Sequence, residues 1–212
     1  MALSGGGLFG VLLGLHLLQR AAGPFDHWPK SWGFDHWWGF LSGAAGQYDP
    51  IITQDNTILG VPEGEDGEQY YFPDDLTDKS IEWLHALRAQ DRNKPWFLYY
   101  STGCSHAPHH VPKEWADKYQ GRFDEGYEQY AIDAVARMKQ MGIVPDSTTL
   151  APMNSMADAI NSEGVPWPES DHVLPWDQLD EDHKKVFRRM AEVFAGFIAY
   201  TDHEIGRLLD FL

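Results

Sequence analysis

Hydrophobic residues recur at spacings of three and four near the C-terminal end, which predicts one long helix from Asp180 to Leu212. A second helix is predicted from Asp74 to about Gln90. Its first residues, Asp74 and Asp75, would offset the positive end of the helix dipole. Its apolar face is formed by Leu76, Ile81, Leu84 and Leu87.

A short continuous run of apolar and aromatic residues, Trp96 to Tyr100, follows Lys94-Pro95. Its length and flanks predict a strand that is buried on both faces. A helix followed by a short connector and a buried strand is half of an α/β crossover unit, so a parallel sheet is predicted. Ligands of such sheets bind at the carboxyl ends of the strands, and the residues after Tyr100 are therefore candidates for a site.

The remaining segments show weaker periodicity. Residues 24–60 are rich in Trp, Gly and Pro, hold no period for long and are predicted to form a packed aromatic loop region. Residues 111–180 alternate short helical pieces with Pro-rich loops, which indicates an insertion over the core, and Glu125 to Met141 has a helical period.

Residues 1–22 form an apolar N-terminal segment of uncertain origin. Leu8 to Leu18 is an apolar run of eleven residues, too short to cross a bilayer, which needs about 20. The run is long enough for a secretory signal peptide, but it lacks a basic flank. The alternative is a non-homologous start of the chain, so the compartment, cytoplasmic or periplasmic and secreted, stays open.

Composition excludes several classes of protein. The formal net charge of −16 argues against a nucleic-acid partner, because no basic stripe for phosphates is present. A single cysteine, Cys104, excludes an intramolecular disulfide framework and a Cys-rich zinc site. Nine Trp, nine Tyr and eleven Phe supply enough apolar surface for a buried core.

The strongest local signal for chemistry is the segment Ser101 to Pro112, which contains His106, His109 and His110 between prolines. Imidazole can bind a metal, donate hydrogen bonds to an oxyanion or move protons near neutral pH. A rigid loop with surface histidines is the alternative. Cys104 could act as a nucleophile with His106, but a space-filling role suits its spacing better.

Two Asp-His pairs, Asp26-His27 and Asp35-His36, could be metal ligands, but the surrounding tryptophans favour polar groups that anchor an aromatic loop. Asp202-His203 is predicted on the polar side of the long helix. Asp55-Asn56 is best explained as a turn. A metal-dependent His hydrolase would need ligands that this pattern does not supply.

Three stretches together resemble the middle of an arylsulfatase-type sulfatase. The first runs from Gly23-Pro-Phe-Asp-His-Trp-Pro29 to Gly39-Phe40-Leu41. The second runs from Lys94-Pro-Trp-Phe-Leu-Tyr-Tyr100 through Ser105-His-Ala-Pro-His-His-Val-Pro to Tyr119. The third is Phe194-Ala-Gly-Phe-Ile-Ala-Tyr-Thr-Asp-His-Glu-Ile-Gly-Arg-Leu-Leu209.

The resemblance implies a partial alkaline-phosphatase-like α/β sandwich with a mostly parallel sheet and flanking helices. It implies hydrolysis of sulfate esters at a calcium site by a formylglycine made from Cys or Ser. It also implies that His106 contacts the substrate sulfate, which is sound chemistry for an imidazole donor. The Cys-x-Pro-Ser-Arg signature of the formylglycine and the expected metal aspartates do not occur, so no catalytic or metal residue is assigned.

On this basis residues 23–212 are expected to be the middle part of a sulfatase catalytic domain. The expected activity is that of a sulfuric ester hydrolase acting on a small-molecule sulfate ester, with no nucleic-acid partner and no membrane span. The 212-residue chain is expected to be inactive alone. The alternative is a non-catalytic binding module for sulfated ligands.

Overall fold

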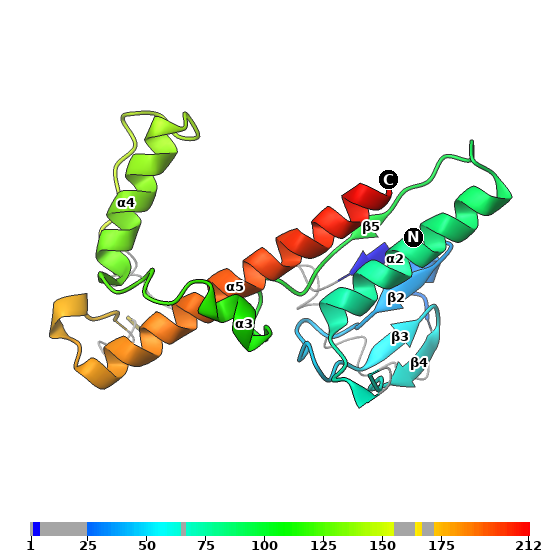
Figure 1. The fold of residues 1–212 in the computed structure, drawn as a ribbon, viewed down its shortest axis with the longest axis horizontal. Helices are drawn as coiled ribbons and strands as arrows, with labels where there is room; N and C mark the ends of the chain where they lie inside the picture. Colours follow the sequence, from blue (N-terminus) through cyan, green and yellow to red (C-terminus); the bar gives the residue numbers. More distant parts are fainter. Residues whose placement is uncertain (1, 5–24, 65–66, 155–163, 167–171) are drawn as a thin grey trace. The chain divides into compact units, whose positions relative to one another are not determined.

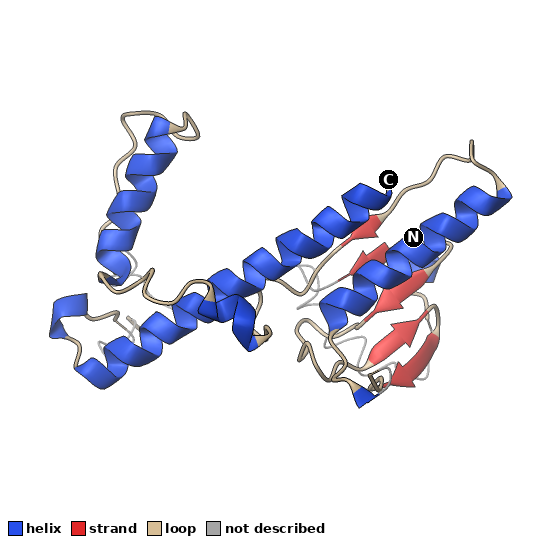
Figure 2. Cartoon of the chain, viewed as in Figure 1, coloured by secondary structure: helices blue, strands red, loops and turns tan. Residues whose placement is uncertain are grey.

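The computed structural model describes residues 2–4, 25–64, 67–154, 164–166 and 172–212. The chain divides into two units, one of Met1–Lys118 with Val193–Leu212 and the other of Tyr119–Glu192. Figures 1 and 2 show that the first unit holds the strands, which establishes the predicted α/β class for that unit. The predicted apolar run Leu8 to Leu18 lies outside the described residues.

The sheet of the first unit has five short strands in the order β4-β3-β2-β1-β5. β1 (Ala2–Ser4) pairs in parallel with both β2 (Trp37–Gly39) and β5 (Tyr99–Tyr100). β3 (Ile52–Gln54) is antiparallel to β2 and to β4 (Thr57–Gly60). The predicted parallel pairing is therefore present next to β5, and an antiparallel hairpin extends the other edge.

The prediction that residues 24–60 form only loops is wrong, because they contain β2, β3, β4 and the 3-10 helix η1 (Pro29–Trp32). The strands have three or four residues, too few for a period of two to be visible in sequence. Asp55 organises them: its carboxylate accepts a 3.0 Å hydrogen bond from the Trp37 N–H and its own N–H donates to the Trp37 carbonyl. Asp55 has a φ of 50°, which confirms the turn predicted there.

The prediction of a strand buried on both faces at Trp96 to Tyr100 is also wrong. β5 has only two residues and lies at the edge of the described sheet. Leu98 and Tyr100 pack against the core, whereas Phe97 is 65% and Tyr99 52% exposed. The apolar run identified the strand, but burial of its second face depends on neighbours that sequence does not name.

Helix α2 (Phe72–Gln90) lies on one face of the sheet (Figure 1). Phe72 and Leu76 pack with Phe40 and Ile52 into one buried cluster. The predicted helix is confirmed, with Asp74 and Asp75 in its first turn. Asp75 also accepts hydrogen bonds from the Trp38 indole (2.9 Å) and the Tyr70 hydroxyl (2.6 Å), so this carboxylate fixes the helix to β2.

The long C-terminal helix is confirmed as α5 (Glu181–Phe211). In the first unit its residues Phe197 and Leu208 are buried. The short helix α3 (Lys113–Asp117) approaches α5 where the latter carries Gly196. A Cβ atom at Gly196 would lie 2.7 Å from the Ala116 nitrogen, so a residue without a side chain is required for this contact.

The second unit contains α4 (Gly126–Gln140), which confirms the helical period seen from Glu125, and the 3-10 helix η4 (Trp176–Gln178). Gly126, at a φ of 86°, lies against the ring of Trp176. The backbone N–H of Trp176 donates to the Glu128 carboxylate at 2.9 Å. In the described ranges of the chain, none of the helices combines the length and the apolar character needed for a bilayer crossing.

Candidate functional site

The histidine loop, Ser101 to Pro112, leaves the carboxyl end of β5, as the sequence predicts for a ligand-binding position. Its Cys104–Ser105 and Ala107–Pro108 peptide bonds are cis. The adjacent histidines His109 and His110 contact different neighbours. The His109 ring lies edge-on to Phe194, with 5.1 Å between centroids, and His110 stacks on Tyr48 at 5.6 Å.

His110 is held by both its ring and its backbone. The Gln47 N–H donates to its Nδ1 at 3.2 Å, which places the proton of a neutral ring on Nε2. The Tyr71 hydroxyl donates to its carbonyl at 2.9 Å. These contacts join the loop to the residues before α2, so His110 serves loop packing here.

His106 differs from the other two histidines of the loop because it is exposed, whereas His109 and His110 are half-buried. Its N–H donates to the Gly103 carbonyl at 3.0 Å, which closes a tight turn. Its Nδ1 lies 2.6 Å from the Ala107 carbonyl oxygen, so Nδ1 carries the proton and donates to that oxygen. The Nε2 atom is then available to a ligand. In the imidazolium form of the ring, Nε2 would donate a charge-assisted hydrogen bond.

Gln47 is a residue of this site that sequence reasoning missed. Its side chain is buried, its carbonyl accepts the Phe72 N–H at 2.8 Å at the start of α2, and its amide donates to the Ala45 carbonyl at 3.0 Å. A Cβ atom at Gly103 would lie 2.7 Å from the Gln47 amide. Gln47 therefore sets the position of the turn that carries His106, and a lone Gln in a Gly- and Ala-rich segment gives no signal of that role.

Cys104 is half-buried beside Thr201, and burial raises the pKa of its thiol. A thiol with a raised pKa is mostly protonated near neutral pH and is a weak nucleophile. This agrees with the space-filling role favoured by the sequence.

No group of three or more His, Cys, Asp or Glu side chains among the described residues is arranged to hold a metal ion. In the first Asp-His pair, the Asp26 carboxylate lies 3.6 Å from Nε2 of His27, and both side chains are exposed. In the second pair, the His36 ring contacts Trp83, with 6.0 Å between ring centroids. The described residues therefore do not form a calcium site.

Comparison with known proteins assigns the family. The family model described as Sulfatase matches residues 18–212, nearly the whole chain. The chain belongs to the sulfatase family. The match extends over both units of the structure.

Two curated relatives are similar to this sulfatase-family chain. It is 26% identical over 193 residues to an arylsulfatase of Klebsiella aerogenes, covering 87% of this chain and 37% of the relative. It is 23% identical over 199 residues to an uncharacterized sulfatase of Schizosaccharomyces pombe, covering 88% of this chain and 33% of the relative. The chain thus spans about a third of the length of these relatives.

A solved putative sulfatase from Bacteroides fragilis is also similar. It is 17% identical, with a TM-score of 0.47, and the similarity covers 85% of this chain and 29% of that one.

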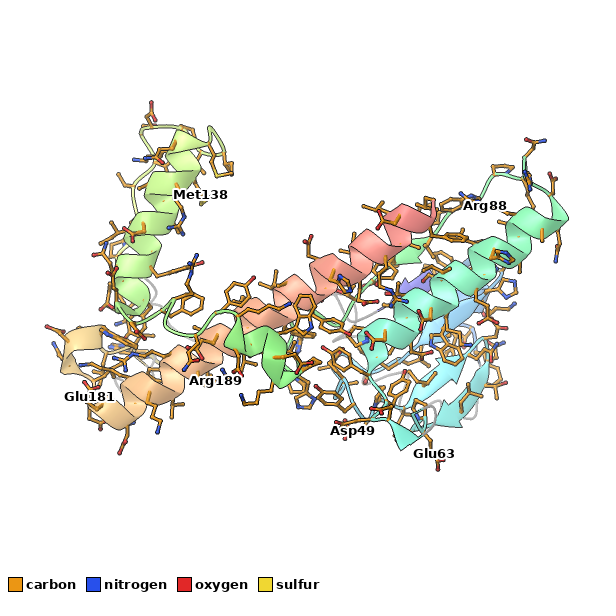
Figure 3. All side chains as sticks on the ribbon, viewed as in Figure 1. Asp49, Glu63, Arg88, Met138, Glu181 and Arg189 are labelled. Atoms are coloured by element: carbon orange, nitrogen blue, oxygen red, sulfur yellow. The ribbon has the colours of Figure 1, made fainter. Side chains whose placement is uncertain are left out.

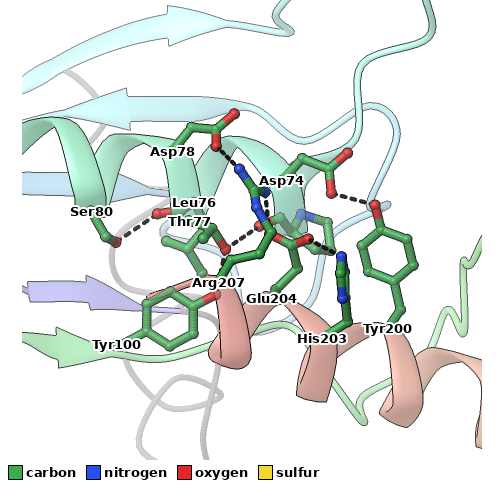
Figure 4. A network of polar contacts seen from close by, with 11 residues as sticks. Asp74, Leu76, Thr77, Asp78, Ser80, Tyr100, Tyr200, His203, Glu204 and Arg207 are labelled. Carbon is green, nitrogen blue, oxygen red and sulfur yellow. Dashed lines mark hydrogen bonds and ion pairs between the residues drawn. The ribbon is translucent and has the colours of Figure 1, made fainter. Parts of the chain in front are cut away.

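The third stretch of the sulfatase resemblance, on α5, makes a polar network with α2 (Figure 4). Arg207 donates to Asp78 of α2 and, at 2.7 Å, to Glu204 one turn earlier on α5. Tyr200 donates to Asp74, and the Thr77 and Tyr100 hydroxyls lie 2.8 Å apart. At the other end of α2, Arg88 donates to the carbonyls of the last two residues of the chain (Figure 3).

Burial raises the pKa of the carboxyl groups in this network. Desolvation raises the pKa of Asp74, Asp75 and Glu204, despite the hydrogen bonds that oppose it. A carboxyl whose pKa is higher in the folded than in the unfolded state binds its proton more tightly when folded. The contribution of such a carboxyl group to the free energy of unfolding is therefore complete below its pKa in the unfolded chain, about 4. It is lost as the pH rises through the pKa of the group in the folded protein.

We expect mild acidification from neutrality towards about pH 4.5, near the unfolded Glu pKa, to raise the free energy of unfolding. Urea denaturation followed by circular dichroism across this range measures it. Glu204→Gln removes one of the three groups and should flatten the profile. A free energy of unfolding that rises steadily from pH 5 to 7 would contradict the expectation.

Proposed function

We propose that this chain supplies part of the catalytic domain of a sulfuric ester hydrolase of the arylsulfatase type, in which His106 contacts the sulfate group. The observation that carries the proposal is the placement of an exposed imidazole, with its Nε2 directed to no described residue, on a turn at the carboxyl end of β5. An imidazolium N–H at that position donates a charge-assisted hydrogen bond to a sulfate oxygen. Family membership supports the ester class of substrate.

In this proposal His106 and Gln47 have different roles. His106 binds and orients the sulfate, and Gln47, through Gly103 and His110, holds the turn that presents it. The nucleophile and the calcium ligands are not supplied by these residues, because the formylglycine signature is missing from the sequence and the described residues form no metal group. Without them the charge that develops on the transferring sulfate lacks its main stabilisation.

The test of activity is an assay with 4-nitrophenyl sulfate, in the presence of calcium and a formylglycine-generating enzyme. We expect no turnover above background from the 212-residue chain. Turnover that disappears in His106→Ala would contradict the proposed inactivity of the chain. Binding of sulfated ligands without turnover, by a chain that folds cooperatively as a monomer, would favour the non-catalytic binding module.

The role of His106 has its own test. We expect His106→Ala to weaken binding of 4-nitrophenyl sulfate about tenfold, because one charge-assisted hydrogen bond of roughly 1.5 kcal/mol is lost. Isothermal titration calorimetry measures the change. The matched control is His85→Ala, which removes an exposed imidazole from α2 and should leave binding unchanged. Equal affinity of the His106 variant and the unmodified chain would remove His106 from the site.

A further inference from the structure

A concave site lies at the other end of β5 from the histidine loop. It is an open cleft of about 350 Å³, within the range of roughly 300–1,000 Å³ that small-molecule sites occupy. Three segments line it: the end of η1 with the turn that follows, one face of α2 and the residues Lys94 to Phe97 that lead into β5. Because Lys94 to Phe97 precede β5 and the histidine loop follows it, the cleft shares no lining residue with the turn that carries His106.

The lining of this cleft, which we call the aromatic cleft, is dominated by large flat rings. Trp32 is 68% exposed, and Trp83 and Trp96 face the same space. The ring centroids of Phe34 and Phe97 are 6.3 Å apart, and the two ring planes are tilted by 32°. This contact joins the turn to the segment before β5. Gly33, at a φ of 93°, makes the sharp turn that directs Phe34 towards the cleft.

Free polar groups accompany these rings. Asp35 and Lys94 line the cleft. No described residue makes an ion pair or a hydrogen bond with the Asp35 carboxylate or with the Lys94 ammonium group. The indole N–H groups of Trp32, Trp83 and Trp96 likewise have no acceptor among the described residues. An apolar protein surface closing over the cleft would leave these groups buried and unpaired, which is costly.

The ligand that suits this lining has an apolar face and hydrogen-bonding edges. We infer that the aromatic cleft binds a pyranose ring of a neutral oligosaccharide, with its C–H face stacked on the tryptophans and its hydroxyl groups bonded to Asp35, Lys94 and the indole N–H groups. Charge favours a neutral sugar over an anionic one, because one acid and one base line the cleft and the chain carries −16 overall. The inference does not rest on sulfate ester chemistry or on His106.

The test is isothermal titration of the 212-residue chain with three neutral hexasaccharides: cellohexaose, chitohexaose and laminarihexaose. We expect at least one to bind with a dissociation constant on the order of 1 mM, as an open site of this size allows. Trp32→Ala, which removes an exposed side chain and so spares the core, should weaken that binding about tenfold. Lys94→Ala should weaken it to a smaller extent.

The matched control is Tyr130→Ala, which removes an exposed aromatic ring from α4 outside the cleft and should leave affinity unchanged. Failure of all three sugars to bind at about 10 mM, tenfold above the expected constant, would overturn the inference. Equal loss of binding in Trp32→Ala and Tyr130→Ala would also overturn it. Sedimentation that finds a dimer dissociated by Trp32→Ala, without sugar binding, would assign the cleft to contact between copies of the chain.

Discussion

Phe72→Ala is expected to lower the free energy of unfolding by about 4 kcal/mol, because removing a buried phenylalanine loses its burial and leaves a cavity. Phe72 is fully buried, packs its ring against that of Phe40 at a tilt of 58° with 5.1 Å between centroids, and contacts Ile52 and Leu76. Its N–H also binds the Gln47 carbonyl at 2.8 Å. Urea denaturation followed by circular dichroism measures the loss.

The matched control is Leu209→Ala on α5, which removes a side chain that is 62% exposed. That control should shift stability by less than about 0.5 kcal/mol. A loss in Phe72→Ala no larger than in Leu209→Ala would mean that the cluster around Phe72 is not the core of this unit.

Arg207→Ala is expected to cost about 2 kcal/mol, because it leaves the buried Glu204 carboxylate without its arginine, although solvent screens part of this pairing since Arg207 is itself 37% exposed. Glu204 is only 2% exposed and accepts a 2.7 Å hydrogen bond from Arg207, which also pairs with Asp78 of α2. Truncating one partner of a buried pair costs more than the pair itself contributes, since the remaining charge is desolvated and unpaired. The free energy of unfolding in urea measures this cost.

A double variant separates that penalty from simple loss of packing. Glu204→Gln in the Arg207→Ala background removes the stranded charge, so it should recover part of the lost stability. The surface control is Lys79→Ala, which breaks an exposed pair with Glu82 and should change stability by less than about 1 kcal/mol. If the double variant is no more stable than Arg207→Ala alone, the unpaired charge is not the cause.

The network around Arg207 gives a structural reason for the third stretch of sulfatase resemblance. Tyr200, Glu204 and Arg207 recur on one side of α5 at helical spacing and all reach α2 or its neighbours. Their polar groups join two helices separated by about half the chain, while Phe197 and Leu208 supply the apolar contact. Asp202 and His203 lie on the exposed part of the helix, as the sequence predicts.

The candidate site was only partly predictable. The position of His106 after β5 followed from the aromatic run and the prolines around it. The support it receives from Gln47 did not, because the hydrogen bonds joining Gln47 to His110 and Phe72 connect segments that are far apart in sequence. The aromatic cleft escaped prediction for the same reason: its three lining segments carry no shared pattern until the chain folds.

The sequence by itself determined the helices, the α/β class and the family. Helical spacing of apolar residues, Asp74 and Asp75 in a first turn and three stretches of sulfatase resemblance are local signals, and propensity or residue identity alone generates them. Only the tertiary structure decided the four short strands before α2, the edge position of β5 and the exposure of Phe97 and Tyr99. Strand pairing and burial are contacts between distant segments, so their free energy exists only once those segments meet.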